Sequence, residues 1–371
     1  MKDLPTVKLG LIGCGGFGRF CINAVVRMSE ADLVAIVDSD SNLLEKTAKE
    51  FNLRGFKDPA HLSQMPDIEM VHIVTPPDTH FPLAHSFLEK DKHVLCEKPL
   101  ALSIKDAVHL IDIAAKMQKI IPVNFVLRYT PIVDMVKEII EMDLLGKPIR
   151  AYFENYATDE SLNPDHWFWD KTKSGGIFVE HGVHFFDLYH YWFGELDVVW
   201  AIGYQRPDTG QEDRVMAILN SKSGVLVHHY HGFDQPAVLD RQIHRIICEQ
   251  GEIIIEGWIP VSLKIDALVS NPQADKLHQI FPDSDISFMN NGKMTNQICK
   301  ARGRTIKASK RIKIEYHSPI SKLNLYTEAI QRLLIDQITY IRNSEHQRVV
   351  TEQNGLTALK YAIKAQKFNK N

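Results

Sequence analysis

The sequence predicts an α/β fold: an N-terminal, doubly wound parallel sheet, followed by an α+β domain with an open-faced, mostly antiparallel sheet. Three observations carry this prediction. Short apolar strand patterns alternate with helical patterns up to about residue 126. A glycine-rich turn follows the first of these strands. Beyond residue 126, strand patterns follow one another with few helices between them. We therefore expect two domains, residues 1–126 and residues 127–371.

The glycine-rich turn reads Gly13-x-Gly15-x-x-Gly18, between a strand pattern at 9–12 and a helical pattern at 20–28. Gly13 allows a tight turn, Gly15 lets a pyrophosphate approach the backbone, and Gly18 lets the helix pack close to the strand. The N-terminus of the helix favours phosphate groups. Asp38 ends the next strand about 20 residues later, where an acid binds the ribose hydroxyls. Together these features predict a Rossmann-type dinucleotide site.

The rest of the first domain continues the alternation. Helical patterns cover 42–51, 81–89 and 103–117, and strand patterns cover 33–37, 70–74, 93–95 and 121–126. Ligands bind beyond the carboxyl ends of parallel strands. We therefore expect the residues at or near those ends to converge on one crevice, namely Gly13, Asp38, Thr75, Lys98 and Asn124.

The second domain shows helical patterns at 132–142, 323–341 and 355–368. Its strand patterns lie at 149–156, 198–204, 215–219, 225–231, 243–248 and 252–256. Segment 271–310 is polar without a clear period, so we expect an irregular insertion there. On strand 225–231 the odd-numbered residues share one face and the even-numbered residues share the other. A sheet with helices on one side must cover its other face, which predicts a homodimer or homotetramer formed through this sheet.

Composition excludes several classes of protein. Hydrophobic residues make up 44% and charged residues 24%, which is typical of a globular protein. A net charge of −3 gives no reason to expect nucleic acid or an anionic membrane as a partner. No apolar run approaches the roughly 20 residues that span a bilayer, and no signal peptide is evident. The five cysteines are scattered without CxxC spacing, which favours free thiols in a reducing cytoplasm over a disulfide framework or a zinc site.

Lys98 follows a strand end in the motif Glu97-Lys98-Pro99. An ammonium there would point into the crevice and stabilise an alkoxide as a hydride leaves. A solvated surface lysine is the alternative. In the second constellation, Glu180 and His184 are four residues apart and share one side of a helical turn. An imidazole suits the removal of an alcohol proton near neutral pH, and Glu180 or Asp187 would orient it. A metal site made of His181, His184 and Glu180, or histidines that only pack, are the alternatives.

Aromatic residues are candidates for binding a sugar ring, because such a ring has apolar C–H faces. Tyr156, Trp167 and Trp169 are the candidates, and Arg128 and Asp187 are further substrate contacts. Ordinary packing is the alternative for each of them.

Taken in order, these motifs resemble the glucose–fructose oxidoreductase / inositol dehydrogenase (Gfo/Idh/MocA) family. The resemblance rests on Gly13-x-Gly15-x-x-Gly18, Asp38, Thr75-Pro76-x-x-x-His80, Glu97-Lys98-Pro99, Arg128-Tyr129-x-Pro131, Gly146 and Gly175-Gly176…Gly182-x-His184-x-x-Asp187. It implies a Rossmann domain joined to an open-faced sheet domain. It also implies that Lys98 and His184 act at the substrate carbon, with Glu180 where the family commonly has Asp. The cofactor would contact Gly16, Phe17, Thr75, Pro76, His80 and Glu97 besides the residues already named.

The sequence therefore predicts an NAD(H)-dependent oxidoreductase that acts on a hydroxyl-bearing carbon of a sugar or polyol. NAD is favoured over NADP because Asp38 repels a 2′-phosphate and Ser39-Asp40 brings no arginine. Two alternatives remain: an enzyme that recycles NAD while it cleaves glycosides, and a non-catalytic sugar- or NAD-sensing regulator.

Overall fold

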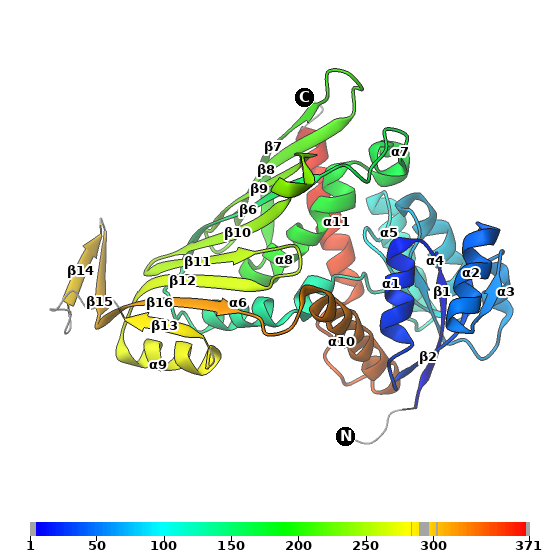
Figure 1. Ribbon diagram of the computed structural model, residues 1–371, viewed down its shortest axis with the longest axis horizontal. Coiled ribbons are helices and arrows are strands. Elements are labelled where there is room, and N and C mark those ends of the chain that lie inside the picture. Colours follow the sequence, from blue (N-terminus) through cyan, green and yellow to red (C-terminus); the bar gives the residue numbers. More distant parts are fainter. Residues whose placement is uncertain (1–4, 283, 289–296, 302, 369–371) are drawn as a thin grey trace. The chain divides into compact units, whose positions relative to one another are not determined.

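The computed structural model describes residues 5–282, 284–288, 297–301 and 303–368 (Figure 1). The chain divides into two compact units, and neither is a continuous segment. The first unit comprises Met1–Tyr129, Pro164–Asp187 and Tyr326–Lys364, and the second comprises Thr130–Asn163, Leu188–Leu325 and Ala365–Asn371. Two later segments belong to the first unit, so these units are not continuous domains and do not test the predicted boundary between residues 126 and 127. The division into residues 1–126 and 127–371 stays a prediction.

The first unit is built on a five-stranded parallel sheet in the order β3-β2-β1-β4-β5. Its strands are β1 (Val7–Ile12), β2 (Ala31–Val37), β3 (Arg54–Phe56), β4 (Met70–Ile73) and β5 (His93–Cys96). Every residue of β4 is buried, as expected for a parallel strand with both faces covered. The predicted parallel sheet is confirmed.

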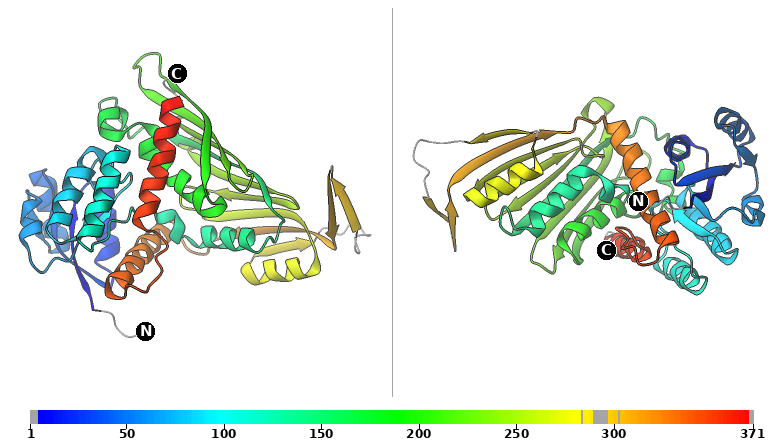
Figure 2. Two further views of the ribbon diagram at one scale, coloured as in Figure 1. Left: turned by 180° about the vertical axis from the view of Figure 1, so that it is seen from behind. Right: turned by 90° about the horizontal axis from the view of Figure 1, so that it is seen from below.

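Helices lie on both sides of this sheet (Figure 2). They include α1 (Gly16–Val25), α2 (Ser41–Phe51), α3 (Ala60–Gln64), α4 (His80–Glu89) and α5 (Ile104–Lys116). The returning segments add α7 (Lys171–Ser174), α10 (Lys322–Arg342, from Tyr326 on) and α11 (Glu352–Phe368, as far as Lys364). Local sequence sets the helix starts: the Asp40 carboxylate accepts from two amides of α2, and the Ser103 hydroxyl accepts from the Asp106 amide at the start of α5.

One predicted strand of this unit is wrong. Segment 121–126 forms only an isolated bridge, between Val123 and Cys96. The segment runs along β5, because Cys96 donates to the Pro122 carbonyl and Asn124 donates to the Cys96 carbonyl. Proline has no N–H to extend the ladder, and the chain turns into a 3₁₀ helix at Val126–Tyr129. β3 and α3 were not predicted, because elements this short carry too few residues to show a period.

The second unit holds a nine-stranded sheet in the order β13-β16-β12-β11-β10-β6-β9-β8-β7. The strands are β6 (Pro148–Thr158), β7 (Leu196–Gln205), β8 (Glu212–Ser221), β9 (Leu226–Gln235), β10 (Arg241–Cys248), β11 (Gly251–Glu256), β12 (Ser262–Val269), β13 (Asp285–Phe288) and β16 (Lys310–His317). Among the described residues only β6 and β9 pair in parallel within it. The mostly antiparallel sheet is confirmed.

The described part of segment 271–310 forms regular elements, so the expectation of an irregular insertion is wrong there. It contains α9 (Asn271–Ile280), β13, and a hairpin of β14 (Gln297–Ala301) and β15 (Arg304–Ala308). A capping box between Ser270 and Gln273 starts α9, with proline in the first turn. This start signal is visible in the sequence, but the low apolar content of the segment hides it.

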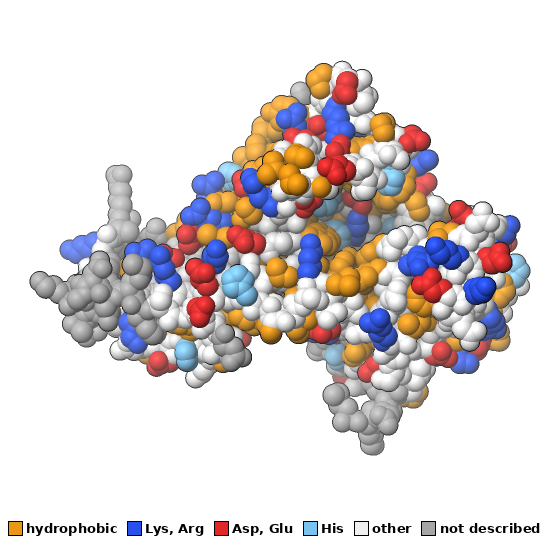
Figure 3. Space-filling model, viewed as in Figure 1, with side chains coloured by type: hydrophobic (Ala, Val, Ile, Leu, Met, Phe, Trp, Pro, Cys, Tyr) orange, Lys and Arg blue, Asp and Glu red, His pale blue; other side chains and the backbone are white. Residues whose placement is uncertain are grey.

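The large sheet has one covered face and one open face. The helices α6 (Pro131–Glu141), α9 and the second-unit part of α8 (Val183–Phe193) lie on one side of it (Figure 2). Val227, His229 and His231 are buried toward that side, whereas Leu226 is exposed. The predicted alternation along this strand is confirmed. On the open face, hydrophobic side chains gather over β7–β9 (Figure 3), and Trp200, Tyr204 and Leu226 are among the exposed ones.

Two further observations bear on the predicted class. None of the described helices has both the length and the apolar character needed to cross a membrane. Four of the five cysteines, Cys14, Cys21, Cys96 and Cys248, are buried free thiols. The side chain of Cys299 lies outside the described residues.

Candidate functional site

The glycine motif forms an open cradle at the start of α1. Gly13 has a φ of +102°, and a Cβ there would lie 2.1 Å from the Val74 carbonyl oxygen. A Cβ at Gly18 would lie 1.9 Å from the Gly13 carbonyl oxygen, so β1 and α1 meet backbone to backbone. In contrast, nothing lies within 4 Å of a Cβ at Gly15 or Gly16. The exposed backbone at the helix N-terminus therefore suits a phosphate group.

Asp38 faces the same turn from the end of β2. Its Oδ2 accepts from the Cys14 amide at 2.7 Å, and its Oδ1 accepts from the Asp40 amide at 2.8 Å. These two bonds fix the carboxylate while each oxygen keeps lone pairs for a ligand hydroxyl. Burial raises the pKa of the Cys14 thiol to about 12, and the nearby Asp38 charge adds to that rise. The Cys14 thiol is therefore uncharged at physiological pH and places no negative charge beside the glycine motif.

The His80 ring links the segments that follow β4 and β5, because it contacts one carbonyl oxygen in each of them. The two ring nitrogens of His80 lie 2.9 Å from the Thr75 carbonyl oxygen and 2.6 Å from the Pro99 carbonyl oxygen. His80 is fully buried, and burial lowers its pKa. Its polar atoms thus bind backbone, and a contact between His80 and a cofactor stays a prediction. The same holds for Phe17, whose ring lies 5.8 Å from that of Tyr326, and for Pro76.

Lys98 forms an ion pair with Glu180 across 82 residues of chain. Its ammonium donates to the Glu180 carboxylate and, at 3.0 Å, to the Glu180 carbonyl oxygen. Both side chains are mostly buried, with 18% and 10% of their surfaces exposed. An ammonium has three N–H groups, and the third has no partner among the described residues. The sequence placed both residues in one site but did not predict this pair.

A π-helical turn at Phe178–Gly182 presents Glu180 to the lysine. It runs directly into α8, which begins at Val183. A π turn carries one extra residue per turn, which redirects side chains relative to a regular helix, and such turns are frequent at functional sites. The helical pattern beyond Gly182 is confirmed, whereas the π turn before it was not predicted.

His184 follows one turn later and is buried next to Phe125, with ring centroids 6.3 Å apart. Burial, and to a lesser extent the charge of Lys98, lower the pKa of His184 well below its usual value. The imidazole is therefore neutral at physiological pH and able to accept a proton. Asp187 is paired with Arg128, which donates to both of its carboxylate oxygens at 2.7 Å, and its orientation of His184 stays a prediction.

The Arg128–Asp187 pair is almost completely buried. Burial raises the pKa of Asp187, and the guanidinium offsets part of that rise. Arg128 also donates to the Val349 carbonyl at 3.1 Å, so it ties the returning C-terminal segment to the site. This geometry explains both residues as supports of the unit, and their contact with substrate stays a prediction.

The aromatic candidates separate between the units. Trp167 and Trp169 are half-buried in the first unit, on either side of the buried Phe168. Tyr156 belongs to β6 of the second unit, where its ring lies 5.3 Å from Tyr230 and 4.7 Å from the Arg241 guanidinium. Substrate binding by all three stays a prediction.

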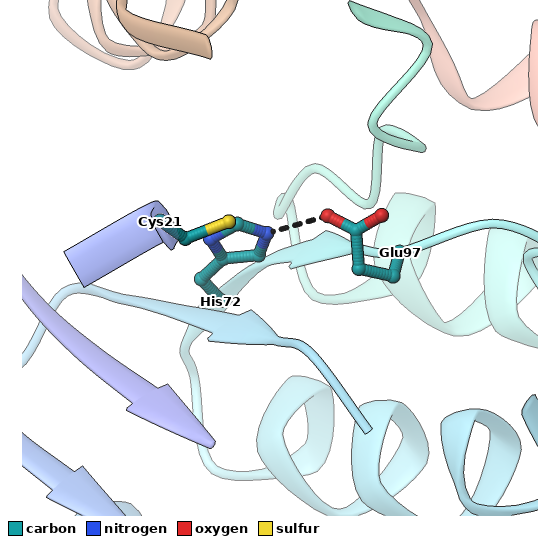
Figure 4. Close-up of side chains that lie close together, drawn as sticks. All are labelled: Cys21, His72 and Glu97. Atoms are coloured by element: carbon teal, nitrogen blue, oxygen red, sulfur yellow. Dashed lines mark hydrogen bonds and ion pairs between the residues drawn. The ribbon is translucent and has the colours of Figure 1, made fainter. Parts of the chain in front are cut away.

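A buried polar cluster behind Glu97 was missed by sequence reasoning (Figure 4). His72 Nε2 lies 3.1 Å from Glu97 Oε1, and Asn124 donates to the same oxygen at 2.6 Å. With Cys21, His72 and Glu97 form the group of three possible metal ligands within 4.8 Å that the described residues contain. His181, His184 and Glu180 form no such group there. The available signal was a histidine inside an apolar strand.

Two family models match most of the chain that carries this site. Residues 7–125 match the oxidoreductase family with an NAD-binding Rossmann fold, and residues 133–254 match the GFO/IDH/MocA C-terminal domain. Together they cover more than half of the chain, so the protein belongs to the Gfo/Idh/MocA family of oxidoreductases.

Relatives and solved structures agree with this assignment. Myo-inositol 2-dehydrogenase of Thermotoga maritima is 29% identical over 227 residues, which cover 59% of this chain and 66% of that protein. The WlbA dehydrogenase of Bordetella pertussis, solved with NADH and UDP-GlcNAcA, has a TM-score of 0.79 at 17% identity, covering 100% of this chain and 97% of that one. A 3-ketoreductase of Actinomadura kijaniata, solved with NADP and TDP-benzene, has a TM-score of 0.76 at 15% identity, covering 98% of each chain. These two structures establish a common fold.

Proposed function

We propose that this protein is an NAD(H)-dependent oxidoreductase that transfers a hydride to or from a hydroxyl-bearing carbon of a sugar, polyol or derivative. One observation carries the proposal. Glu180 binds the Lys98 ammonium in two contacts and leaves it one N–H, and the same unit holds His184, whose lowered pKa keeps it neutral. A donor and a proton acceptor are the two groups that an alcohol needs when it loses a hydride.

The cofactor site is assigned to the cradle of Gly13, Gly15, Gly16 and Gly18, with Asp38 at the ribose. When bound, the nicotinamide ring accepts or supplies the hydride. NAD is favoured because a 2′-phosphate would meet the carboxylates of Asp38 and Asp40. Arg19, the cation next to the glycine motif, does not offset them, because Glu50 accepts from its guanidinium at 2.9 and 2.7 Å.

The chain's own groups then have distinct roles. His184 takes the hydroxyl proton of an alcohol, because its lowered pKa keeps it unprotonated at neutral pH. Lys98 donates its third N–H to the same oxygen and stabilises the developing alkoxide. Glu180 is the partner that holds the ammonium in place through its carboxylate and its carbonyl oxygen. In the reducing direction the same groups return the proton.

Separate observations support the proposed substrate class, assembly and location of the protein. Trp167 and Trp169 supply half-exposed aromatic surface in the unit that holds Lys98, which suits a sugar or polyol ring. The name of the Thermotoga maritima relative points to the same class of substrate. The apolar, open face of the nine-stranded sheet supports a homodimer or homotetramer, and the buried free thiols support a cytoplasmic protein.

NAD reduction across a panel of inositols, aldoses, sugar acids and amino sugars tests the proposal. Lys98→Met and His184→Asn should lower kcat by at least about 100-fold while NAD still binds, as expected for acid–base groups. Asp38→Ala should weaken NAD binding without removing Lys98 or His184. If calorimetry detects no binding of NAD or NADP by the wild-type protein, the proposed function is wrong.

A further inference from the structure

His72 is a polar residue in the most buried strand of the first sheet. Its neighbours on β4 are Met70, Val71 and Ile73, and all four residues are buried. His72 itself is 0% exposed. An aliphatic side chain would fill this place without burying polar atoms, and buried polar atoms cost free energy unless they are hydrogen-bonded. The histidine therefore needs an explanation beyond packing.

The explanation lies in its bond to Glu97. Both hydrogen bonds to this carboxylate, from His72 and Asn124, end on Oε1. The other oxygen, Oε2, accepts from no residue that the structure describes, and 9% of the side chain is exposed. The carboxylate is thus anchored through one oxygen and presents the other. Glu97 follows the last residue of β5, so it stands at the carboxyl end of the parallel sheet, where ligands of such sheets bind.

This contact requires a proton on His72 Nε2, because a carboxylate oxygen can only accept. Among the described residues, Nδ1 has no hydrogen-bond partner. The sulfur of Cys21 lies beside the ring (Figure 4), and burial keeps this thiol protonated by raising its pKa well above the usual value. A protonated thiol is a weak donor toward a bare ring nitrogen. The cluster therefore keeps a partly satisfied histidine in the sheet, at a cost in stability.

We infer that His72 is a positioning residue, which holds Glu97 so that its exposed oxygen accepts a hydrogen bond from a hydroxyl of the bound dinucleotide. The inference rests on the proposed function and adds three residues to it: Cys21 on α1, His72 on β4 and Glu97 after β5. His72 itself touches no ligand. Compared with an aliphatic residue at this place, His72 packs less favourably but fixes the orientation of Glu97.

The test is a set of variants measured by calorimetry with NAD alone. His72→Leu keeps the volume and removes the donor, so NAD binding should weaken by about 5- to 10-fold, the range expected for one oriented hydrogen bond. His72→Gln keeps an N–H that reaches Glu97 and should recover binding to within about 2-fold. Glu97→Gln should weaken binding at least as much as His72→Leu. The double variant should bind no more weakly than Glu97→Gln, because both changes remove the same interaction.

Thermal unfolding without cofactor separates this role from a structural one. His72→Leu should match or exceed the wild-type Tm, since it removes a buried polar atom with no partner. A matched control is His93→Leu on β5, whose ring accepts from the Ile120 amide at the opposite end of the strand. Its NAD affinity should be unchanged. The inference is overturned if His72→Leu binds NAD as tightly as the wild type, or if its loss adds in full to that of Glu97→Gln. Failure of the wild type to bind NAD would instead overturn the proposed function.

Discussion

Glu180 holds Lys98 twice, once through its carboxylate and once through its own carbonyl oxygen at 3.0 Å. The π turn makes this possible, because it brings the backbone and the side chain of one residue to the same ammonium. The family resemblance implies the shorter Asp here, and the longer Glu of this chain reaches the lysine. Glu180 therefore keeps the negative charge that an Asp would have at this position, on a longer side chain.

Glu180→Gln is expected to lower kcat by roughly 10- to 100-fold, because a hydrogen bond to a charged group is worth about 1.5–3 kcal/mol. The carbonyl contact of Lys98 survives, so the lysine stays in place and NAD affinity should change by less than about 3-fold. Steady-state kinetics and NAD titration measure the two quantities. An exposed control, Glu89→Gln, should leave both unchanged. A Glu180→Gln variant with the wild-type kcat would remove Glu180 from the catalytic set.

The pH dependence of turnover reports on His184. Its folded-state pKa lies well below 6.5, and the proposed base is the neutral form. In the oxidising direction kcat/KM should therefore stay independent of His184 ionisation through neutral pH and fall only on the acid side, below pH 6.5. In His184→Asn this acid limb should be absent from the residual activity. A wild-type profile that rises as the pH drops below 6.5 would contradict the assignment.

The sequence predicts what depends on local pattern. Gly13 and Gly18 lie where backbone meets backbone, and Asp38 binds the glycine turn through the Cys14 amide, because each role needs a particular residue type at a particular spacing. Lys98, Glu180 and His184 were all named as catalytic candidates. Their roles stay predictions, although the structure places Glu180 on Lys98 and places the Lys98 charge near His184.

What escaped prediction depends on partners far away in the sequence. Arg128 and Asp187 pair with each other although 59 residues separate them, and sequence reasoning did not predict this pair. The support of Glu97 by His72 spans 25 residues and two strands. Segment 271–310 was misjudged for another reason, since its strand β13 is paired with β16 and not defined by its own apolar pattern.

Breaking the Arg128–Asp187 pair should be costly. Arg128→Leu leaves a carboxylate buried without its two charge-assisted bonds, which typically lowers the free energy of unfolding by about 3–5 kcal/mol. Urea denaturation with tryptophan fluorescence measures the change. The double variant Arg128→Leu/Asp187→Leu should recover a large part of the loss, because no lone charge remains. If the single variant is as stable as the wild type, the pair does not support the unit.

Acid sensitivity is expected from the histidines buried under the large sheet. His231 and His244 are 0% exposed, and burial lowers the pKa of each to about 3. In the unfolded chain the pKa of histidine is about 6.5. Between these values the unfolded state binds more protons than the folded state. Stability is therefore complete above pH 6.5 and falls as the pH drops, by up to about 1.4 kcal/mol per pH unit for each histidine.

Urea denaturation at pH 7, 6 and 5 tests this directly. His231→Leu should reduce the dependence of the unfolding free energy on pH by up to about 1.4 kcal/mol per unit below pH 6.5, since one group no longer has to stay neutral. An exposed histidine serves as the matched control, and His317→Gln should leave the slope as in the wild type. Equal slopes for wild type and His231→Leu would mean that His231 gains a proton in the folded state. The sheet would then have to open locally to admit it.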